Sequence, residues 1–231
     1  QKAINYLVSY YQKNPTKTDL NFFKKRIVGN ISDLMLKQNE AKNYLKVLTT
    51  NSKYATTWLK NSDRIDIKSF VAQSYEQAGV YQEALKINQN ILKKLIKIKG
   101  THEEKERMVN EHLPSVESLY LRLASVAVNT RKMGSAYQYL KNIKVPSKLS
   151  SAEKIERVEL LSVVENERGN LKKAKEYLKN LIGTWQGKPE LLSSTYLKLA
   201  RLQLQSKDYL NAELSLKEVE RLHADKAVDD D

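Results

Sequence analysis

Two of the three histidines stand in a highly charged stretch, and metal binding is the first chemistry to consider there. His102 begins the run His-Glu-Glu-Lys-Glu, but the second histidine four residues on, which a zinc-binding His-Glu-x-x-His helix requires, is absent. His102, Glu106 and His112 could ligate a metal only if a helix brought them together. We therefore expect a solvated, charged insertion here and no metal site.

A phosphate-binding loop is the second chemistry that the residue types suggest. The segment 183–189 (Gly-Thr-Trp-Gln-Gly-Lys-Pro) has a spacer one residue too short, and Pro189 replaces the required hydroxyl residue. It reads better as a turn between helices, with Trp185 packed against it. No Ser/His/Asp set has a local signature, and no paired carboxylates stand in an apolar stretch. The sequence contains no Cys, which excludes thiolate chemistry. We expect no enzyme, no cofactor and no metal.

Composition indicates a folded, basic, helical protein. The 231 residues include 40 Lys and Arg against 27 Asp and Glu, 41% hydrophobic residues, 7 Gly and 4 Pro. So few Gly and Pro argue against an all-β fold and against disorder. No apolar run approaches the roughly 18 residues of a membrane helix. Residues 1–60 hold 11 Lys and Arg against 3 Asp and Glu, so this end should attract acidic partners.

An internal repeat organises the chain. Alanines recur at spacings of 38, 43, 52, 38 and 38 residues: Ala3, Ala41, Ala84, Ala136, Ala174 and Ala212. Apolar residues follow most of them at four and seven positions. A small residue precedes five of them by twelve positions: Gly29, Ala72, Ala124, Ser162 and Ala200. These offsets place one apolar face on each of two helices that cross closely. Each unit is therefore predicted to be an antiparallel helix pair that must stack on its neighbours.

The predicted units form one array over residues 1–231. Their expected bounds are 1–17 (half a repeat), 18–60, 61–113, 114–149, 150–187 and 188–223, with an acidic tail at 224–231. Residues 52–60, with Trp58, should extend the preceding helix, and 99–112 should form an exposed loop or short helix. Ile4, Leu7 and Val8 would have no partner helix in the half repeat. We therefore expect a fragment of a longer array.

The repeat resembles the tetratricopeptide family. The segment Ala72-Gln-Ser-Tyr75-Glu-Gln-Ala78-Gly79-Val80-Tyr81-Gln-Glu-Ala84 is similar to that family's small–Tyr–Gly–Tyr–Ala core. The resemblance covers about five and a half degenerate repeats. It implies an all-α, right-handed superhelical solenoid of antiparallel helix pairs, without catalysis, that binds proteins. The period of about 38 residues is one helical turn longer than the family's, which indicates longer helices.

The resemblance places a binding groove on the concave face, lined by the first helix of each pair. In this register the candidate binding residues are Arg26, Asn30, Gln73, Arg122, Asn129 and Arg201. Arg26 and Asn30 occupy positions similar to part of the carboxylate clamp of some family members, and Arg122 adds a third donor. The other clamp positions lack matching residues.

Two other kinds of partner, a membrane and nucleic acid, fit the sequence less well than a protein does. The basic segment 91–99 could lie on an anionic membrane. The repeat, however, already requires Ile87, Ile91, Leu95 and Ile98 as core of a second helix. Nucleic acid would need exposed aromatic residues among the charges, whereas most of the 13 tyrosines fall at expected core or near-core positions, such as Tyr75 and Tyr209.

We therefore expect a scaffold or adaptor that binds another protein or peptide segment, preferably acidic. The alternative is a regulatory or peptide-sensing domain attached to an effector domain. Membrane contact is expected only through parts outside this chain. The sequence is compatible with the cytoplasm and with a bacterial periplasm or cell envelope.

Overall fold

The computed structural model describes residues 1–13, 17–59, 64–97 and 113–229. The secondary structure in these ranges is entirely helical, so the predicted all-α class is confirmed there. The chain divides into two compact units, Gln1–Val116 and Glu117–Asp231. The insertion expected at 99–112, with His102 and His112, lies outside the described residues.

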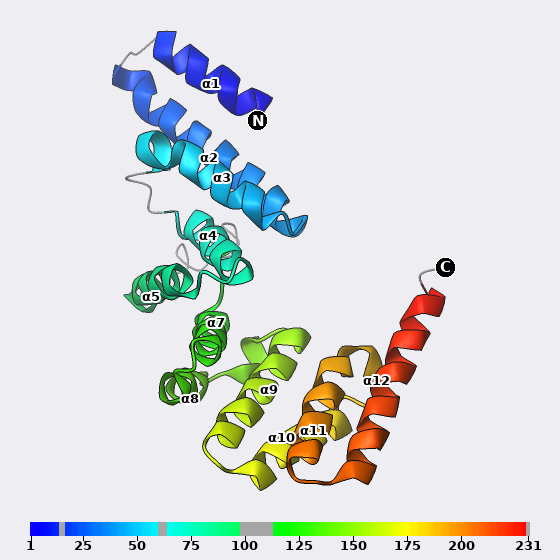
Figure 1. The fold of residues 1–231 in the computed structure, drawn as a ribbon. Coiled ribbons are helices and arrows are strands. Elements are labelled where there is room, and N and C mark those ends of the chain that lie inside the picture. The colour runs from blue at the N-terminus through cyan, green and yellow to red at the C-terminus, as the bar shows by residue number, and fades with distance from the viewer. Residues whose placement is uncertain (14–16, 60–63, 98–112, 230–231) are drawn as a thin grey trace. The chain divides into compact units, whose positions relative to one another are not determined.

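The first unit consists of consecutive helices that lie side by side (Figure 1). They are α1 (Lys2–Lys13), α2 (Lys17–Glu40), α3 (Tyr44–Tyr54), a π-helical continuation η1 (Ala55–Leu59), α4 (Ile65–Gln77) and α5 (Tyr81–Lys97). The predicted extension of the helix beyond residue 52 is confirmed up to Leu59. Within it Trp58 makes an edge-on contact with Tyr11, with ring centroids 5.2 Å apart.

Helix α1 has a partner, contrary to the expectation from the half repeat. Ile4 is only 1% exposed, and Leu7 and Val8 pack against the same apolar cluster. That cluster contains Ile27 and Ile31 of α2, because α1 packs along α2. The long α2 therefore covers a helix on each side, α1 before it and α3 after it.

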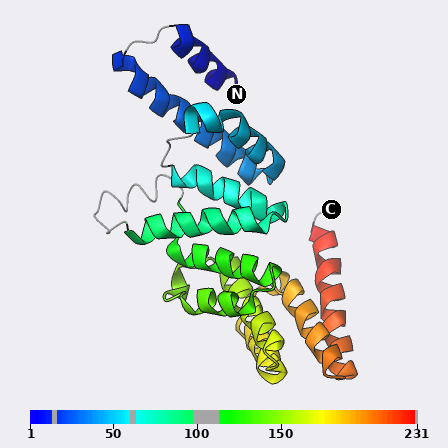
Figure 2. The ribbon, with the colours of Figure 1, turned by 60° about the vertical axis from the view of Figure 1, so that its left-hand side comes forward.

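The second unit continues the alternation of helices and tight turns (Figure 2). Its elements are α7 (Val116–Asn129), α8 (Met133–Lys141), the short η2 (Pro146–Lys148), α9 (Ser151–Glu167), α10 (Leu171–Thr184), η3 (Pro189–Leu191), α11 (Ser193–Gln205) and α12 (Tyr209–Asp229). Ser150 and Glu153 form a reciprocal cap at the start of α9. Helix α12 runs through most of the predicted acidic tail, because no Gly or Pro ends it.

Five turns between paired helices share one hydrogen-bonded geometry. Each contains one residue with positive φ, between 54° and 83°: Lys42, Gly79, Arg131, Gly169 and Lys207. The next residue donates its N–H to the carbonyl five residues earlier, as Val80 does to Tyr75 at 2.9 Å and Asn170 to Glu165 at 2.9 Å. This bond defines the Schellman end of a helix, which satisfies free carbonyls and reverses the chain.

These turns correct the register of the repeat. The residue five positions after each positive-φ residue is at most 1% exposed: Val47, Ala84, Ala136, Ala174 and Ala212. Four of the predicted alanines are therefore confirmed as buried contacts, but Ala41 is wrong because it lies exposed in a turn. Val47 takes its place, and the buried Met35, not Gly29, stands twelve residues before it.

Other details of the predicted register also differ. Ala3 is exposed, and its neighbour Ile4 is buried instead. The turn between α7 and α8 has its positive-φ residue at Arg131, and the nearby Gly134 falls inside α8. Tyr209, expected in or near the core, is 64% exposed at the start of α12. In contrast, Ile91 and Leu95 are buried in α5 as predicted, whereas Ile87 is partly buried and Ile98 lies outside the described residues.

Candidate functional site

The six candidate binding residues all lie on first helices of the pairs. The first unit holds Arg26 and Asn30 on α2 and Gln73 on α4, and the second holds Arg122 and Asn129 on α7 and Arg201 on α11. Arg26, Asn129 and Arg201 are exposed, whereas the other three are partly buried. The exposed three are therefore the better placed to reach a partner.

Arg26 and Asn30 are neighbours one turn apart on α2. The Asn30 side-chain amide donates to the Arg26 carbonyl at 2.8 Å, so one of its donors is already used. The Arg26 guanidinium lies 5.8 Å from the ring centroid of Phe22, which is 58% exposed. With Val47 as the buried residue of this pair, the positions that the sequence pattern gives to Arg26 and Asn30 belong to Ser32 and Leu36. Arg26 and Asn30 therefore do not occupy the repeat positions on which their similarity to a carboxylate clamp was based.

Arg122 acts within the protein, between α7 and α9. Burial raises the pKa of Glu153, but hydrogen bonds from Ser118 and Ser150 and the charge of Arg122 outweigh it and hold that pKa below its ordinary value. Arg201 differs, because it lies on an accessible face of α11. Leu197, one turn before it, is 37% exposed, and Leu204 is 47% exposed.

Buried carboxylates tie successive first helices together, which the sequence analysis missed. Glu159 of α9 is 6% exposed and accepts hydrogen bonds from α11: 2.6 Å from Ser194, 2.6 Å from Thr195 and 2.8 Å from Lys198. The sequence signal was a carboxylate in the otherwise apolar-faced stretch 155–164, followed one repeat later by Ser, Thr and Lys. Glu159 and Lys198 are therefore structural links and not free groups of the groove.

The first unit has an equivalent link between α2 and α4. The Ser32 hydroxyl donates to the Asp66 carboxylate at 2.5 Å, and Arg64 donates to the same carboxylate from Nε at 2.9 Å and from Nη2 at 2.5 Å. Burial alone would raise the pKa of Asp66. The hydrogen bonds from Arg64 and Ser32 and the charge of Arg64 outweigh this effect, so the pKa lies below its ordinary value. The carboxylate is thus held ionised between the two helices.

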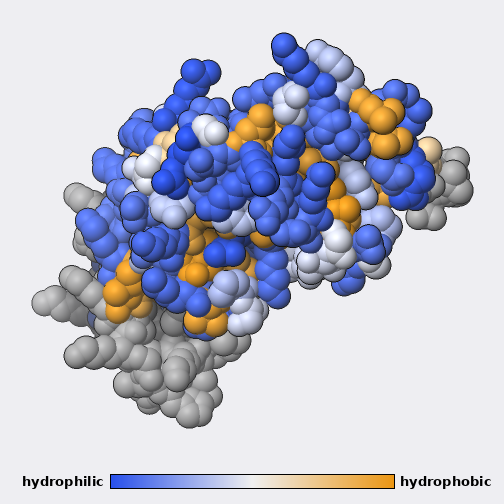
Figure 3. Space-filling view, turned by 90° about the horizontal axis from the view of Figure 1, so that it is seen from below, coloured by the Kyte–Doolittle hydropathy of each residue, from blue (hydrophilic) through white to orange (hydrophobic). Residues whose placement is uncertain are grey.

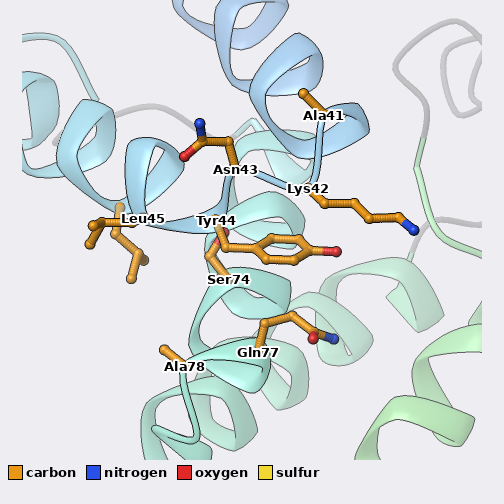
Figure 4. A pocket seen from close by; sticks show the side chains of 9 residues that line it. Ala41, Lys42, Asn43, Tyr44, Leu45, Ser74, Gln77 and Ala78 are labelled. Carbon is orange, nitrogen blue, oxygen red and sulfur yellow. The ribbon is translucent and has the colours of Figure 1, made fainter.

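A cavity of about 410 Å³ lies between the α2–α3 turn and the end of α4 (Figure 4). In this view the Tyr44 ring lies between the side chains of Lys42 and Gln77. Leu45, beside it, is 76% exposed. The cavity offers apolar contact and hydrogen-bonding groups but no carboxylate or histidine, so it is suited to receiving a side chain and not to acid–base chemistry.

The described parts of the chain contain no assembled metal site, and the segment that resembled a phosphate-binding loop forms a turn. Among the described residues, no three His, Cys, Asp or Glu residues come together. His223 lies 3.2 Å from the Ser193 hydroxyl. The segment from Gly183 to Pro189 ends α10 and leads into η3, as the turn interpretation predicts.

The apolar surface on the face shown in Figure 3 is broken into small patches. These patches lie among hydrophilic side chains. Within the residues that the structure describes, no helix has both the length and the apolar character needed to cross a bilayer.

Comparison with known proteins shows the fold. No protein-family model matches the sequence, and no curated protein matches it significantly. Among solved structures, BtubC (BKLC) from P. vanneervenii aligns with a TM-score of 0.62 at 16% identity, over 98% of this chain and 89% of that one. MamA from Desulfovibrio magneticus RS-1 aligns with a TM-score of 0.61 at 15% identity, over 87% and 96%.

A third similar structure consists of TPR-like repeats. The TPR-like repeats of a putative kinesin light chain from P. anserina align with a TM-score of 0.58 at 16% identity, over 87% of this chain and 96% of theirs. These likenesses agree with the five Schellman turns and their buried alanines and valine. The chain therefore has the fold of the tetratricopeptide repeat, built from antiparallel helix pairs.

Proposed function

We propose that this chain is a non-catalytic scaffold that binds another protein or peptide segment along its first helices. The observation that carries the proposal is one register position that holds an exposed polar side chain in every helix pair, twice in the first unit and three times in the second. Seven residues before each buried Val or Ala, at the end of each first helix, stand Glu40, Gln77, Asn129, Glu167 and Gln205, all exposed. Equivalent positions on rigid helices offer hydrogen-bonding groups at fixed spacing within each unit.

Packing explains why these side chains can bind without rearranging. The first helices are fixed to each other by Glu159 in the second unit and by Asp66 in the first. A partner that docks on pre-formed helices costs the receptor little conformational entropy, so more of the contact energy appears as affinity. The same exposed groups lack the paired acid and base that catalysis requires.

Charge favours an acidic partner. The chain carries a formal charge of +13, and residues 1–60 alone carry 11 positive against 3 negative side chains. Arg201, with Leu197 beside it on the same face, can bind a carboxylate next to an apolar side chain. Long-range attraction of this kind weakens as salt screens it.

Selection from a random peptide library displayed on phage tests the proposal. Acidic peptides should be enriched, and their affinity should fall about tenfold or more between about 50 and 500 mM NaCl. Arg201→Glu should weaken the selected peptide by about tenfold or more, whereas Lys179→Glu, on the exposed face of the second helix α10, should not. Failure to enrich any peptide, or equal weakening by both variants, would contradict the proposal.

A further inference from the structure

A second cavity lies within the α9–α10 pair, at the end opposite its Gly169 turn. It has a volume of about 340 Å³ and is lined by the first half of α9, the last turns of α10 and the preceding loop at Pro146. Tyr177, Leu181 and Trp185 give it apolar walls. The exposed side chains of Asn129, Glu167 and Gln205 stand at the other end of the helices, so this cavity is separate from the surface proposed above.

Two cations line this cavity, and neither forms an ion pair or a side-chain hydrogen bond with another described residue. Lys154 and Arg157 both project from α9. The Nε atom of Arg157 is buried and forms no hydrogen bond in the part of the chain that the structure describes. Burial lowers the pKa of Arg157, and among the described residues Tyr177 alone counters that effect, with no contribution from a carboxylate of these residues.

An unpaired, partly buried arginine is expensive, because the lost hydration is not replaced. Buried cations in proteins are usually paired with a carboxylate and hydrogen-bonded. Two carboxylates of α9 have partners elsewhere: Glu159 accepts from α11, and Glu153 accepts from Ser118 and Ser150. No carboxylate stands among the residues that line the cavity, so Arg157 lacks an anionic partner there.

We propose that this cavity binds a peptide carboxylate, with the guanidinium of Arg157 and the ammonium of Lys154 on the anion and an adjacent apolar side chain against Tyr177 and Trp185. The planar guanidinium suits a two-pronged bond to a carboxylate. The apolar walls favour a ligand with an apolar body over a bare anion. The proposal extends the peptide-binding role above to a second site, and the carboxylate is either an Asp or Glu side chain or a chain end.

Trp185 serves as a reporter of occupancy. The chain has two tryptophans, and Trp58→Phe leaves Trp185 alone in a protein whose second unit is unchanged. Four peptides are titrated: acetyl-Gly-Ser-Phe-Asp-Gly-Ser-amide, its Asn counterpart, acetyl-Gly-Ser-Phe with a free carboxylate, and the same peptide amidated. Inorganic phosphate is titrated as a fifth ligand.

The expected result is a saturable change in Trp185 fluorescence with a carboxylate peptide, and at least tenfold weaker binding of its neutral counterpart. Whichever carboxylate peptide binds identifies the source of the anion. Arg157→Gln should weaken this binding by about tenfold or more, the effect of losing a charge-assisted hydrogen bond. Lys179→Gln, a matched loss of one exposed charge, and Arg201→Glu should leave it unchanged.

A second variant separates loss of binding from loss of folding. Arg157→Met keeps the side-chain length without the charge, so its melting temperature should equal or exceed that of the parent while carboxylate binding is lost. Equal binding of acidic and neutral peptides, full binding by Arg157→Gln, or phosphate binding as tight as the best peptide would overturn the assignment. Because Arg201→Glu affects only the first-helix surface, either site can fail while the other stands.

Discussion

Thr195 of α11 donates a 2.6 Å hydrogen bond to Glu159 of α9, and this bond joins two successive first helices. Glu159 stands fifteen residues before the buried Ala174. Ser32, which donates to Asp66, stands fifteen residues before the buried Val47. The same repeat position thus links neighbouring helix pairs in both units. In the second unit the earlier helix supplies the carboxylate, and in the first unit the later helix supplies it.

Removing the carboxylate of Glu159 should strongly destabilise the second unit. Glu159→Ala leaves three donors, Ser194, Thr195 and Lys198, without their acceptor. We expect the free energy of unfolding to fall by about 2–4 kcal/mol, measured by urea denaturation. Glu176→Ala, an exposed change on α10, should shift it by less than about 0.5 kcal/mol. Similar losses in the two variants would show that the link contributes nothing.

The positive-φ turns predict a stabilising substitution. Arg131 has φ of 56°, a conformation that costs a residue with a Cβ but not glycine. Arg131→Gly should raise the free energy of unfolding by about 0.5–1 kcal/mol. Gln138→Gly, at an exposed position inside α8, should lower it by about the same amount. Destabilisation by both glycines would contradict the turn geometry.

The corrected register can be tested with matched alanines. Ala174 has no exposed surface, so Ala174→Leu should overpack the contact between helices and cost about 1–3 kcal/mol. Ala41 lies exposed in its turn, and Ala41→Leu should change the free energy of unfolding by less than about 0.5 kcal/mol. Chemical denaturation of both variants decides the matter. A larger loss from Ala41→Leu than from Ala174→Leu would restore the original alignment.

Asp66 should make the first unit sensitive to acid. Its pKa in the folded protein is below the ordinary value, so its stabilisation is present above about pH 4, the unfolded pKa. That stabilisation is lost as the pH falls through the folded pKa, because the unfolded chain then binds more protons. Urea midpoints of the parent and Asp66→Asn should differ at pH 7, and the difference should shrink as the pH falls below about 4, the unfolded pKa. A constant difference across this range would mean that the carboxylate's charge is unimportant.

Sequence periodicity predicted the helix pairs because buried positions recur at fixed spacing. It succeeded at Ala84, Ala136, Ala174 and Ala212, where a small residue is required by close packing. It failed at Ala41 because the turn there holds Lys42, not glycine, at positive φ, and a valine fills the buried position. The register is normally marked by a glycine in the turn and a small residue five positions later. Here Lys42 and Val47 occupy these positions, so neither mark is present.

The surface was less predictable than the fold. Arg122 was a candidate groove residue, but it interacts with Glu153, about one repeat later in the sequence, just as Lys198 interacts with Glu159, one repeat earlier. Arg157 gave no signal at all, because an arginine on a helix is ordinarily solvated and only the three-dimensional packing shows its Nε to be buried without a partner. Pairing between charged side chains on different repeats depends on helix geometry that periodicity alone does not supply.

Single-cysteine labelling tests the proposed binding surface most directly, because the natural chain has no Cys. Gln205→Cys lies at the exposed end of the first helix α11, and Lys179→Cys lies on the second helix α10. The rate of alkylation by iodoacetamide is measured for each variant with and without a saturating selected peptide. The account predicts that the peptide slows alkylation at position 205 and leaves position 179 unchanged. Protection at 179 alone, or at neither position, would contradict it.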